Sequence, residues 1–252
     1  MKLFKLSGSV CKINAAKQGT GFLLFDGYII TNAHLLENDK TWHTDDQILH
    51  CEVTAIFENE NTGTDHVPLK IKPVIINLQC GFDYRKRRID FVILELEDHN
   101  FNVNGLLCHY GPQPNSGGVC IIGHPDGKVK TMDSTIIIGY EKREETLIKK
   151  KGKLIDTYFL MNDAQKNDAD SIVSQKNNIV TYHTCLFHGA SGSPVFDDLC
   201  QVIGIHTGGL PYAKDKSYIE YAIPLRTILE NFLLKMTEGN KGEILPYNSG
   251  KQ

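Results

Sequence analysis

Short apolar segments separated by turn residues recur along most of this chain, and this pattern constrains the fold more than any other feature. Gly21–Phe25 and Tyr28–Thr31 are joined by Asp-Gly, a dipeptide that favours a tight hairpin turn. Other β-rich segments follow, among them "CEVTAIFE", "LKIKPVII", "RIDFVILELE", "GVCIIGHP", "STIIIGY", "NNIVTYHT", "GSPVFDD" and "CQVIGIHTGG". Their spacing predicts an all-β barrel or sandwich and does not fit alternating strands and helices.

The breaks in this pattern suggest how the chain is divided. Residues 109–118 ("HYGPQPNSGG") are rich in Pro, Gly and Asn, and residues 141–178 form a long charged insertion that is either functional or partly disordered. "PLRTILENFLLKM" begins with proline and repeats apolar residues at helical spacing, which predicts a helix over 224–237. We expect one domain over 1–252, with a first β unit over about 1–110, a second over about 115–223 and the helix at its end.

Composition excludes several classes of protein. The 252 residues, 41% of them hydrophobic, suffice for a sizeable core, and a net charge of −3 argues against a protein built mainly to bind nucleic acid. The N-terminus lacks an apolar stretch of signal-peptide length, and no run approaches the ~18 apolar residues of a membrane span. Seven cysteines without a CxxC pair predict reduced thiols inside a cell. We therefore expect no membrane association, no cofactor and no metal, including one held by His183, Cys185 and His188.

The stretch "HGASGSPVFDD", residues 188–198, has the small residues of a nucleophile loop. A serine becomes a nucleophile when a histidine takes its proton, a buried carboxylate orients that histidine, and backbone N–H groups bind the oxyanion. Ser191 is the candidate nucleophile, and Gly189 permits the tight turn that aims the N–H groups of Gly189 and Ser191 at one point. His34 follows an apolar strand at the start of a short helical turn, and Asp90 stands directly before an apolar run, where a carboxylate needs a partner.

Each of these residues alone also has an ordinary interpretation. A lone histidine is usually a surface or core residue, an aspartate before a strand is often part of a turn, and GxSG occurs by chance. Their order favours the functional interpretation, because His34 and Asp90 lie in the first β-rich half and Ser191 in the second. In this arrangement the chain resembles the chymotrypsin-like serine proteases. The resemblance implies two six-stranded antiparallel β-barrels with a C-terminal helix, and a His34–Asp90–Ser191 triad.

A second serine, Ser116 in "NSGG", also stands among small residues. It lies in the predicted linker, with no glycine two residues before it and no proline after it. We interpret Ser116 as a loop residue.

Three segments make the resemblance more specific within the chymotrypsin-like proteases: "CIIGHPDG", "IDFVILELE" and "HGASGSPVFD". Together these are similar to the peptidase domain of the vertebrate proteins called "family with sequence similarity 111", over roughly residues 15–235. This likeness implies an intracellular serine endopeptidase, nuclear more than cytoplasmic, that is associated with DNA replication and repair and acts on DNA-associated proteins. The partners we consider are a protein or peptide substrate, chromatin reached indirectly, and a second copy of the chain. Family members carry a further N-terminal region, so we expect a short member or an excised catalytic domain.

The fold that this resemblance implies also suggests a specificity site. Cys185, six residues before the serine, would lie at the base of the primary pocket, and it is not acidic. His206, Thr207 and Gly208 of "GIHTGG" would pair with the substrate backbone, while Gly208 leaves the pocket mouth open and Ile219 narrows its wall. We therefore predict cleavage after Phe, Tyr, Leu or Met and not after Lys or Arg.

Ala190 stands where secreted digestive relatives have an aspartate that binds the amino terminus freed by zymogen cleavage. Alanine cannot bind an amine, so we predict no activation of that kind. The oxyanion loop must then be ordered by other contacts, such as those made by oligomerisation or by substrate.

Two other segments have competing interpretations. "YRKRR", residues 84–88, is a solvated loop of the first barrel, a nuclear import signal or a phosphate contact, and we favour the loop. "DTYFLMND", residues 156–163, either packs on the barrel, which we favour, or is an autolysis site.

Two rival functions stay open at this point. A protease fold with a collapsed oxyanion loop would be a catalytically quiet peptide-binding module. A viral-type chymotrypsin-like enzyme would use cysteine as its nucleophile, for which Cys185 is misplaced.

Overall fold

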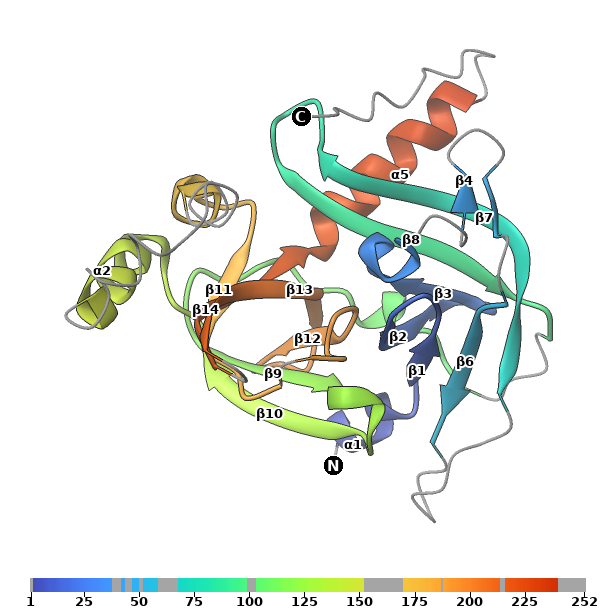
Figure 1. Ribbon diagram of the computed structural model, residues 1–252, viewed down its shortest axis with the longest axis horizontal. Helices are drawn as coiled ribbons and strands as arrows, with labels where there is room; N and C mark the ends of the chain where they lie inside the picture. The colour runs from blue at the N-terminus through green and yellow to red at the C-terminus, as the bar shows by residue number, and fades with distance from the viewer. Residues whose placement is uncertain are drawn as a thin grey trace.

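The computed structural model describes residues 2–37, 42–43, 47–49, 52–58, 68–98, 103–151, 170–186, 188–213 and 216–239. Their strands form two sheets, which lie side by side in Figure 1 with the C-terminal helix across them. The strands divide between the sheets within residues 96–118, at the predicted linker.

The first sheet closes into a barrel. It contains β1 (Val10–Asn14), β2 (Gln18–Phe25), β3 (Tyr28–Thr31), β4 (Trp42–His43), β5 (Ile48–Leu49), β6 (Thr54–Phe57), β7 (Leu69–Phe82) and β8 (Arg88–Leu96). The strand order is β4-β5-β7-β6-β1-β2-β3-β8, and β7 also pairs with β8, so six strands close a ring and β4 and β5 extend it at β7. The predicted six-stranded antiparallel barrel is confirmed, with this two-stranded ribbon as an addition that the sequence did not reveal.

The second sheet contains β9 (Gly118–Gly123), β10 (Thr131–Ile136), β11 (Val180–Tyr182), β12 (Pro194–Asp197), β13 (Val202–Ala213) and β14 (Lys216–Pro224). These six strands are antiparallel and follow the order β10-β9-β12-β13-β14-β11. A bridge between Ile137 and Tyr182 brings the two edge strands of the order together, so the second sheet also curls toward closure.

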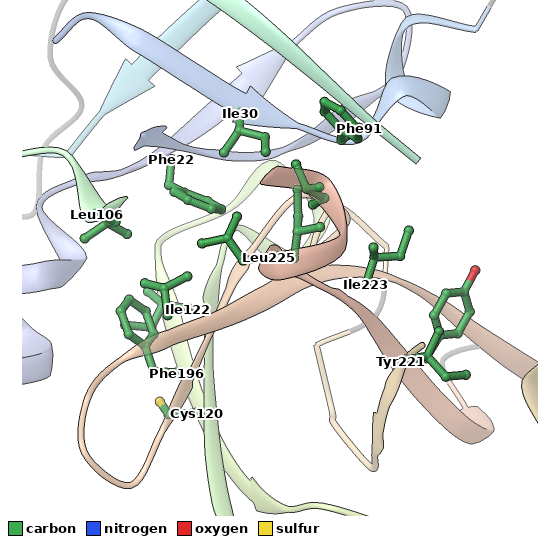
Figure 2. Close-up of a cluster of buried hydrophobic side chains, with 14 of the residues drawn as sticks. Phe22, Ile30, Phe91, Leu106, Cys120, Ile122, Phe196, Tyr221, Ile223 and Leu225 are labelled. Carbon is green, nitrogen blue, oxygen red and sulfur yellow. The ribbon is translucent and has the colours of Figure 1, made fainter. Parts of the chain in front are cut away.

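Alternating side chains give each sheet its own apolar interior. Leu23, Val92 and Leu94 belong to the core cluster of the first sheet, and Tyr182 and Val195 to that of the second. A third cluster joins the two sheets and the base of the C-terminal helix. Figure 2 shows labelled members of it from the first sheet facing those of the second sheet and helix: Phe22, Ile30, Phe91, Ile122, Phe196 and Leu225. Burial of these faces fixes how the two barrels meet, and the interface between them carries the candidate site.

The C-terminal helix α5 (Leu225–Gly239) begins directly after β14, close to its predicted bounds. It contacts β13, β14 and β8. Arg87 at the end of the β7–β8 turn is buried, and it donates to Asp83 (2.7 Å) and to Glu230 of α5 (2.6 Å). The "YRKRR" segment therefore forms the β7–β8 turn of the first barrel, and its buried arginine ties the helix to that barrel.

Two further helices are α1 (Lys2–Ser7) and α2 (Tyr140–Lys151). α2 lies in the charged insertion, where Arg143 is buried and donates to the carbonyl oxygens of Gln175 (2.7 Å) and Ile179 (2.8 Å). "DTYFLMND" lies outside the described residues. Among the helices that the structure describes, none is long and apolar enough to cross a membrane.

Candidate active site

His34 and Asp90 form a hydrogen-bonded pair on the first barrel. His34 lies in a 3-10 turn, η1 (Ala33–Leu36), directly after β3, and Asp90 lies on the neighbouring β8. The His34 Nδ1 atom is 2.6 Å from Asp90 Oδ2, and the His34 backbone N–H donates to Asp90 Oδ1 over 3.1 Å. These contacts fix the ring with Nδ1 toward the carboxylate and Nε2 on the opposite side, where a general base needs its reactive nitrogen.

Asn32 connects this pair to the second barrel. Its side-chain N–H₂ donates to the Asp90 carbonyl oxygen (2.8 Å) and to Thr207 Oγ1 of β13 (3.2 Å). Asn32 is fully buried, so the bonds are shielded from water. The sequence analysis did not single out Asn32, although a buried amide after an apolar strand is a recognisable signal for such a link.

The Ser191 loop is anchored to the strands that lead to His34. The Thr20 backbone N–H donates to the Ser191 carbonyl oxygen over 2.8 Å, and Thr31 Oγ1 donates to the Thr20 carbonyl oxygen over 2.6 Å. Gly192 has φ +92°, and a Cβ there would overlap the Thr20 carbonyl oxygen. The loop can approach β2 this closely because residue 192 is glycine, and Ser191 is thereby held against the edge of the first barrel that carries His34.

Hydrogen bonds from Asp126 and Thr20 orient the Gly189 amide. The Asp126 N–H donates to the His188 carbonyl oxygen over 2.6 Å, and Thr20 Oγ1 donates to the Gly189 carbonyl oxygen over 2.8 Å. In a trans peptide the N–H points opposite the C=O, so the Gly189 N–H faces away from Asp126. Gly189 has φ +87°, and a Cβ would lie 2.6 Å from the His124 carbonyl oxygen, so a larger residue would disturb this orientation.

Ala190 is fully buried in the core cluster of the second sheet, which also contains Leu186. Its carbonyl oxygen accepts from the Ser193 N–H over 3.0 Å. Contacts within this chain therefore order the loop around Ala190.

Cys185 is exposed on the segment before this loop. Its backbone N–H donates to the Asp133 carboxylate over 2.8 Å, and Thr184 donates to the same carboxylate. Partial desolvation and the nearby Asp133 raise the pKa of the Cys185 thiol. The thiol stays protonated at neutral pH, which does not favour a cysteine nucleophile at this position.

The remaining predicted site residues lie on β13 and β14. His206, Thr207 and Gly208 lie on β13, and the His206 carbonyl oxygen accepts from the Gly192 N–H over 2.8 Å. Ile219 is fully buried in the core cluster that joins the barrels. Its neighbour Glu220 lies on the opposite face of β14, where the sequence analysis did not look for a functional residue.

Ser116 is exposed in the segment before β9. The structure thus gives it none of the anchoring contacts that hold Ser191.

A second histidine–carboxylate pair lies behind the Ser191 loop. His206 Nε2 is 3.9 Å from Glu220 Oε2, and the Tyr182 hydroxyl is hydrogen-bonded to His206 Nδ1 at 2.8 Å. Burial, with the nearby His34 charge, lowers the pKa of His206 to about 4. Burial raises the pKa of Glu220 to about 7, against a hydrogen bond with Ser217 that lowers it. His206 is therefore neutral at neutral pH.

A closed β-barrel carries a bonded His34–Asp90 pair, and a glycine-rich serine loop before β12 of the second sheet is anchored to that barrel. This is the arrangement of one large protease family. Residues 19–205 match the family described as "Trypsin-like peptidase domain". The chain belongs to the trypsin-like peptidase family.

Two relatives agree with the likeness that the sequence motifs indicated. The mouse (Mus musculus) protein named "Serine protease FAM111A" is 29% identical over 208 aligned residues, which cover 76% of this chain and 32% of that protein. The human (Homo sapiens) protein named "Serine protease FAM111B" is 27% identical, over 92% of this chain and 33% of that protein. The predicted resemblance is confirmed, and the chain spans about a third of the length of these relatives.

Solved structures support the trypsin-like fold. Deg5 superposes with a TM-score of 0.58 at 20% identity, over 91% of this chain and 90% of that one. The inactive Ser343Ala form of Rv3671c from M. tuberculosis gives a TM-score of 0.56 at 16% identity, over 95% and 91% of the two chains. At these identities the likeness establishes the fold alone.

Proposed function

We propose that this trypsin-like peptidase is a serine endopeptidase that hydrolyses peptide bonds of proteins through His34, Asp90 and Ser191. The observation that carries the proposal is the 2.6 Å bond between His34 Nδ1 and Asp90 Oδ2, beside a serine loop anchored to the same barrel. Family membership and the names of the two relatives support it.

Each residue has a defined part in the proposed reaction. Ser191 Oγ attacks the scissile carbonyl carbon while His34 Nε2 takes the hydroxyl proton, and the same proton then passes to the leaving amine. Asp90 holds the imidazole in the reactive tautomer and stabilises its charged form. The N–H groups of Gly189 and Ser191 bind the oxyanion, and the His188–Asp126 bond supports the required direction of the first. Water then hydrolyses the acyl-enzyme with His34 as base.

The rival function, a quiet peptide-binding module, requires a collapsed oxyanion loop. The contacts of His188 and Gly189 with Asp126 and Thr20 argue against collapse. The deciding test is turnover of an internally quenched peptide by the wild type and by Ser191→Ala. We expect a loss of about 10⁶-fold in turnover for the variant, by analogy with other triads. Equal turnover by both proteins would reject Ser191 as nucleophile, whereas peptide binding without turnover in either would favour the module.

We further propose a preference for a large apolar or aromatic P1 residue. Support comes from the uncharged Cys185 and from the absence of a side chain at Gly208, where β13 would pair with substrate. A peptide library profiled with the wild-type protein should yield cleavage mainly after Phe, Tyr, Leu or Met. A profile dominated by Lys or Arg would contradict this preference.

The cellular role follows from the resemblance to the family 111 peptidases. We propose a nuclear enzyme that acts on DNA-associated proteins, reaches chromatin indirectly and acts as a homo-oligomer. Expression of the tagged Ser191→Ala chain, followed by cell fractionation, should recover it with nuclear proteins bound to DNA. Recovery confined to the cytoplasmic fraction would reject this role while leaving the peptidase activity untouched.

A further inference from the structure

A buried carboxyl group that the proposed mechanism does not use lies beside the strand expected to pair with substrate. Glu220 on β14 is 5% exposed and stands opposite Gly209 of β13. A Cβ at position 209 would overlap the Glu220 carboxyl group, so this group lies directly against the Gly209 backbone. Glycine at position 209 is therefore required for the Glu220 side chain to occupy this place.

Glu220 is also close to the nucleophile loop. Its carboxyl oxygen is 3.9 Å from His206 Nε2, and the His206 backbone bonds to both Gly192 and Ser193 over 2.8 Å. Ala190 and Ala222 belong to one core cluster with Tyr182, whose hydroxyl contacts His206. The Glu220 carboxyl group thus lies next to His206, whose backbone is bonded to the loop that presents Ser191.

The described groups around the Glu220 carboxyl group carry no positive charge. Neutral His206 and the hydroxyl of Ser217 contact its carboxyl group, while Tyr182 adds no positive charge. Within the described residues, no lysine or arginine side chain pairs with it. An ionised carboxylate that is buried without a cation is costly, and a cation supplied by a ligand would relieve that cost.

We propose that Glu220 selects the P1 residue and gives this site a second class of substrate, peptides with lysine at P1, beside those with a large apolar P1 residue. This inference rests on the proposed peptidase function. It also revises the sequence-based expectation about basic residues, which considered the base of the pocket at Cys185 and not the β14 wall.

The geometry of the carboxyl group favours lysine over arginine. One side of the group faces His206 and another bonds Ser217, so only part of its acceptor capacity is open to a ligand. An ammonium group needs a single approach direction, whereas a guanidinium fork binds best to two open oxygens. An aromatic P1 residue remains compatible, because the positive edge of a ring can lie against a carboxyl group.

The same group predicts a pH dependence of selectivity. Among the described residues, the groups that act on Glu220 are Tyr182 on β11, His206 on β13 and Ser217 on β14, and none of them carries a charge near neutral pH. Ionisation of Glu220 itself, with a pKa of about 7, is then the step that changes the charge of the wall. Cleavage after lysine should rise relative to cleavage after phenylalanine as the pH increases through this value.

The test uses quenched peptides that differ only at P1, which is Phe, Lys, Arg or Ala. The wild type should cleave the Lys peptide within about tenfold of the Phe peptide in kcat/KM. Glu220→Gln should lower kcat/KM for Lys about 100-fold and for Phe less than about fivefold, in line with the loss of a buried charge pair. It should also abolish the pH dependence of the Lys/Phe ratio.

Two further variants keep the test decisive. Glu220→Asp retains the charge but withdraws it by one methylene, so it should shift preference from Lys toward Arg even if Glu220→Gln folds poorly. Glu52→Gln, an exposed acid of the first barrel that pairs with Lys70, should match the wild type on every peptide.

The outcomes separate this proposal from the one on which it rests. Cleavage of the Phe peptide without cleavage of the Lys peptide overturns the role of Glu220 and leaves the peptidase function standing. An equal loss on both peptides in Glu220→Gln overturns it too. Cleavage of neither peptide overturns the peptidase function, and the Glu220 proposal with it.

Discussion

Two of the histidine–carboxylate pairs in the described part of the chain, His34–Asp90 on the first barrel and His206–Glu220 on the second sheet, differ in distance and in exposure. His34 and Asp90 are 2.6 Å apart, and the His34 side chain is 26% exposed. His206 and Glu220 are 3.9 Å apart, and their side chains are 3% and 7% exposed. The first pair has a direct bond and a partly exposed imidazole, as proton transfer to or from a substrate requires. The second is buried and bonded elsewhere, so it suits recognition and not proton transfer.

Replacing the acid of the first pair should have the largest effect. Asp90→Asn removes the charge that holds the His34 tautomer, and we expect kcat to fall about 10⁴-fold. The measurement is steady-state turnover of the Phe peptide, with the folded state checked by circular dichroism. Glu37→Gln, which changes an exposed acid at the end of η1, should stay within about twofold of the wild type. If kcat fell as little in Asp90→Asn as in Glu37→Gln, the His34–Asp90 pair would not be the pair that transfers the proton.

Replacing the acid of the second pair should change not only P1 selectivity but also the stability of the fold, and it should do so in a pH-dependent manner. The pKa of Glu220 is raised from 4.5 to about 7 on folding, so the folded state holds this proton more tightly than the unfolded chain. The wild type therefore loses stability as the pH rises from 4.5 through about 7, and Glu220→Gln escapes this loss. The quantity to compare is the free energy of unfolding of the variant minus that of the wild type. Between acidic pH and pH values above about 8, this difference should shift by about 3 kcal/mol in favour of the variant.

Urea denaturation at several pH values measures this gain. His206 acts in the opposite direction, because its lowered pKa removes stability as the pH falls from 6.5 toward about 4, and both proteins share that term. A stability difference that does not vary with pH would contradict the burial of an ionisable Glu220.

Removing the Tyr182 hydroxyl, which is hydrogen-bonded to His206, should have the smallest effect on stability. Tyr182→Phe removes the 2.8 Å bond to Nδ1 and leaves a buried ring nitrogen without this partner, at a cost of about 1–2 kcal/mol. Thermal unfolding compares this variant with Tyr84→Phe, whose ring is 65% exposed on the β7–β8 turn. The control should lie within about 0.5 kcal/mol of the wild type. Equal unfolding free energies for the two variants would show that the Tyr182 hydroxyl does not stabilise the His206–Glu220 pair.

Local sequence signals were sufficient to predict that His34 and Asp90 lie together. His34 and Asp90 each adjoin an apolar strand, and their order before the glycine-rich loop of Ser191 made them recognisable together. The closed barrel also follows from alternation and turn residues, although β4 and β5 are too short to register as strands in the sequence.

The second pair was missed for a physical reason. In "SYIEYAIP" a glutamate between apolar residues looks like the water-facing position of a half-exposed strand. Its burial depends on the pairing of Glu220 with Gly209, a register between β13 and β14 that includes bulges. Likewise, the bonds of Thr20 to Gly189 and Ser191 cross between distant segments. Such contacts appear when the two barrels are assembled, and no local pattern encodes them.

Covalent labelling tests the central claim most directly. A fluorophosphonate reacts with a serine that is activated by a histidine and held beside an oxyanion site, and it ignores an ordinary hydroxyl. Treatment of the wild type, Asp90→Asn and Ser191→Ala, followed by peptide mapping, reports both the rate and the position of the adduct. The account predicts one adduct on Ser191, formed far more slowly in Asp90→Asn and absent from Ser191→Ala. No adduct in the folded wild type, or an adduct on another serine such as Ser116, would contradict it.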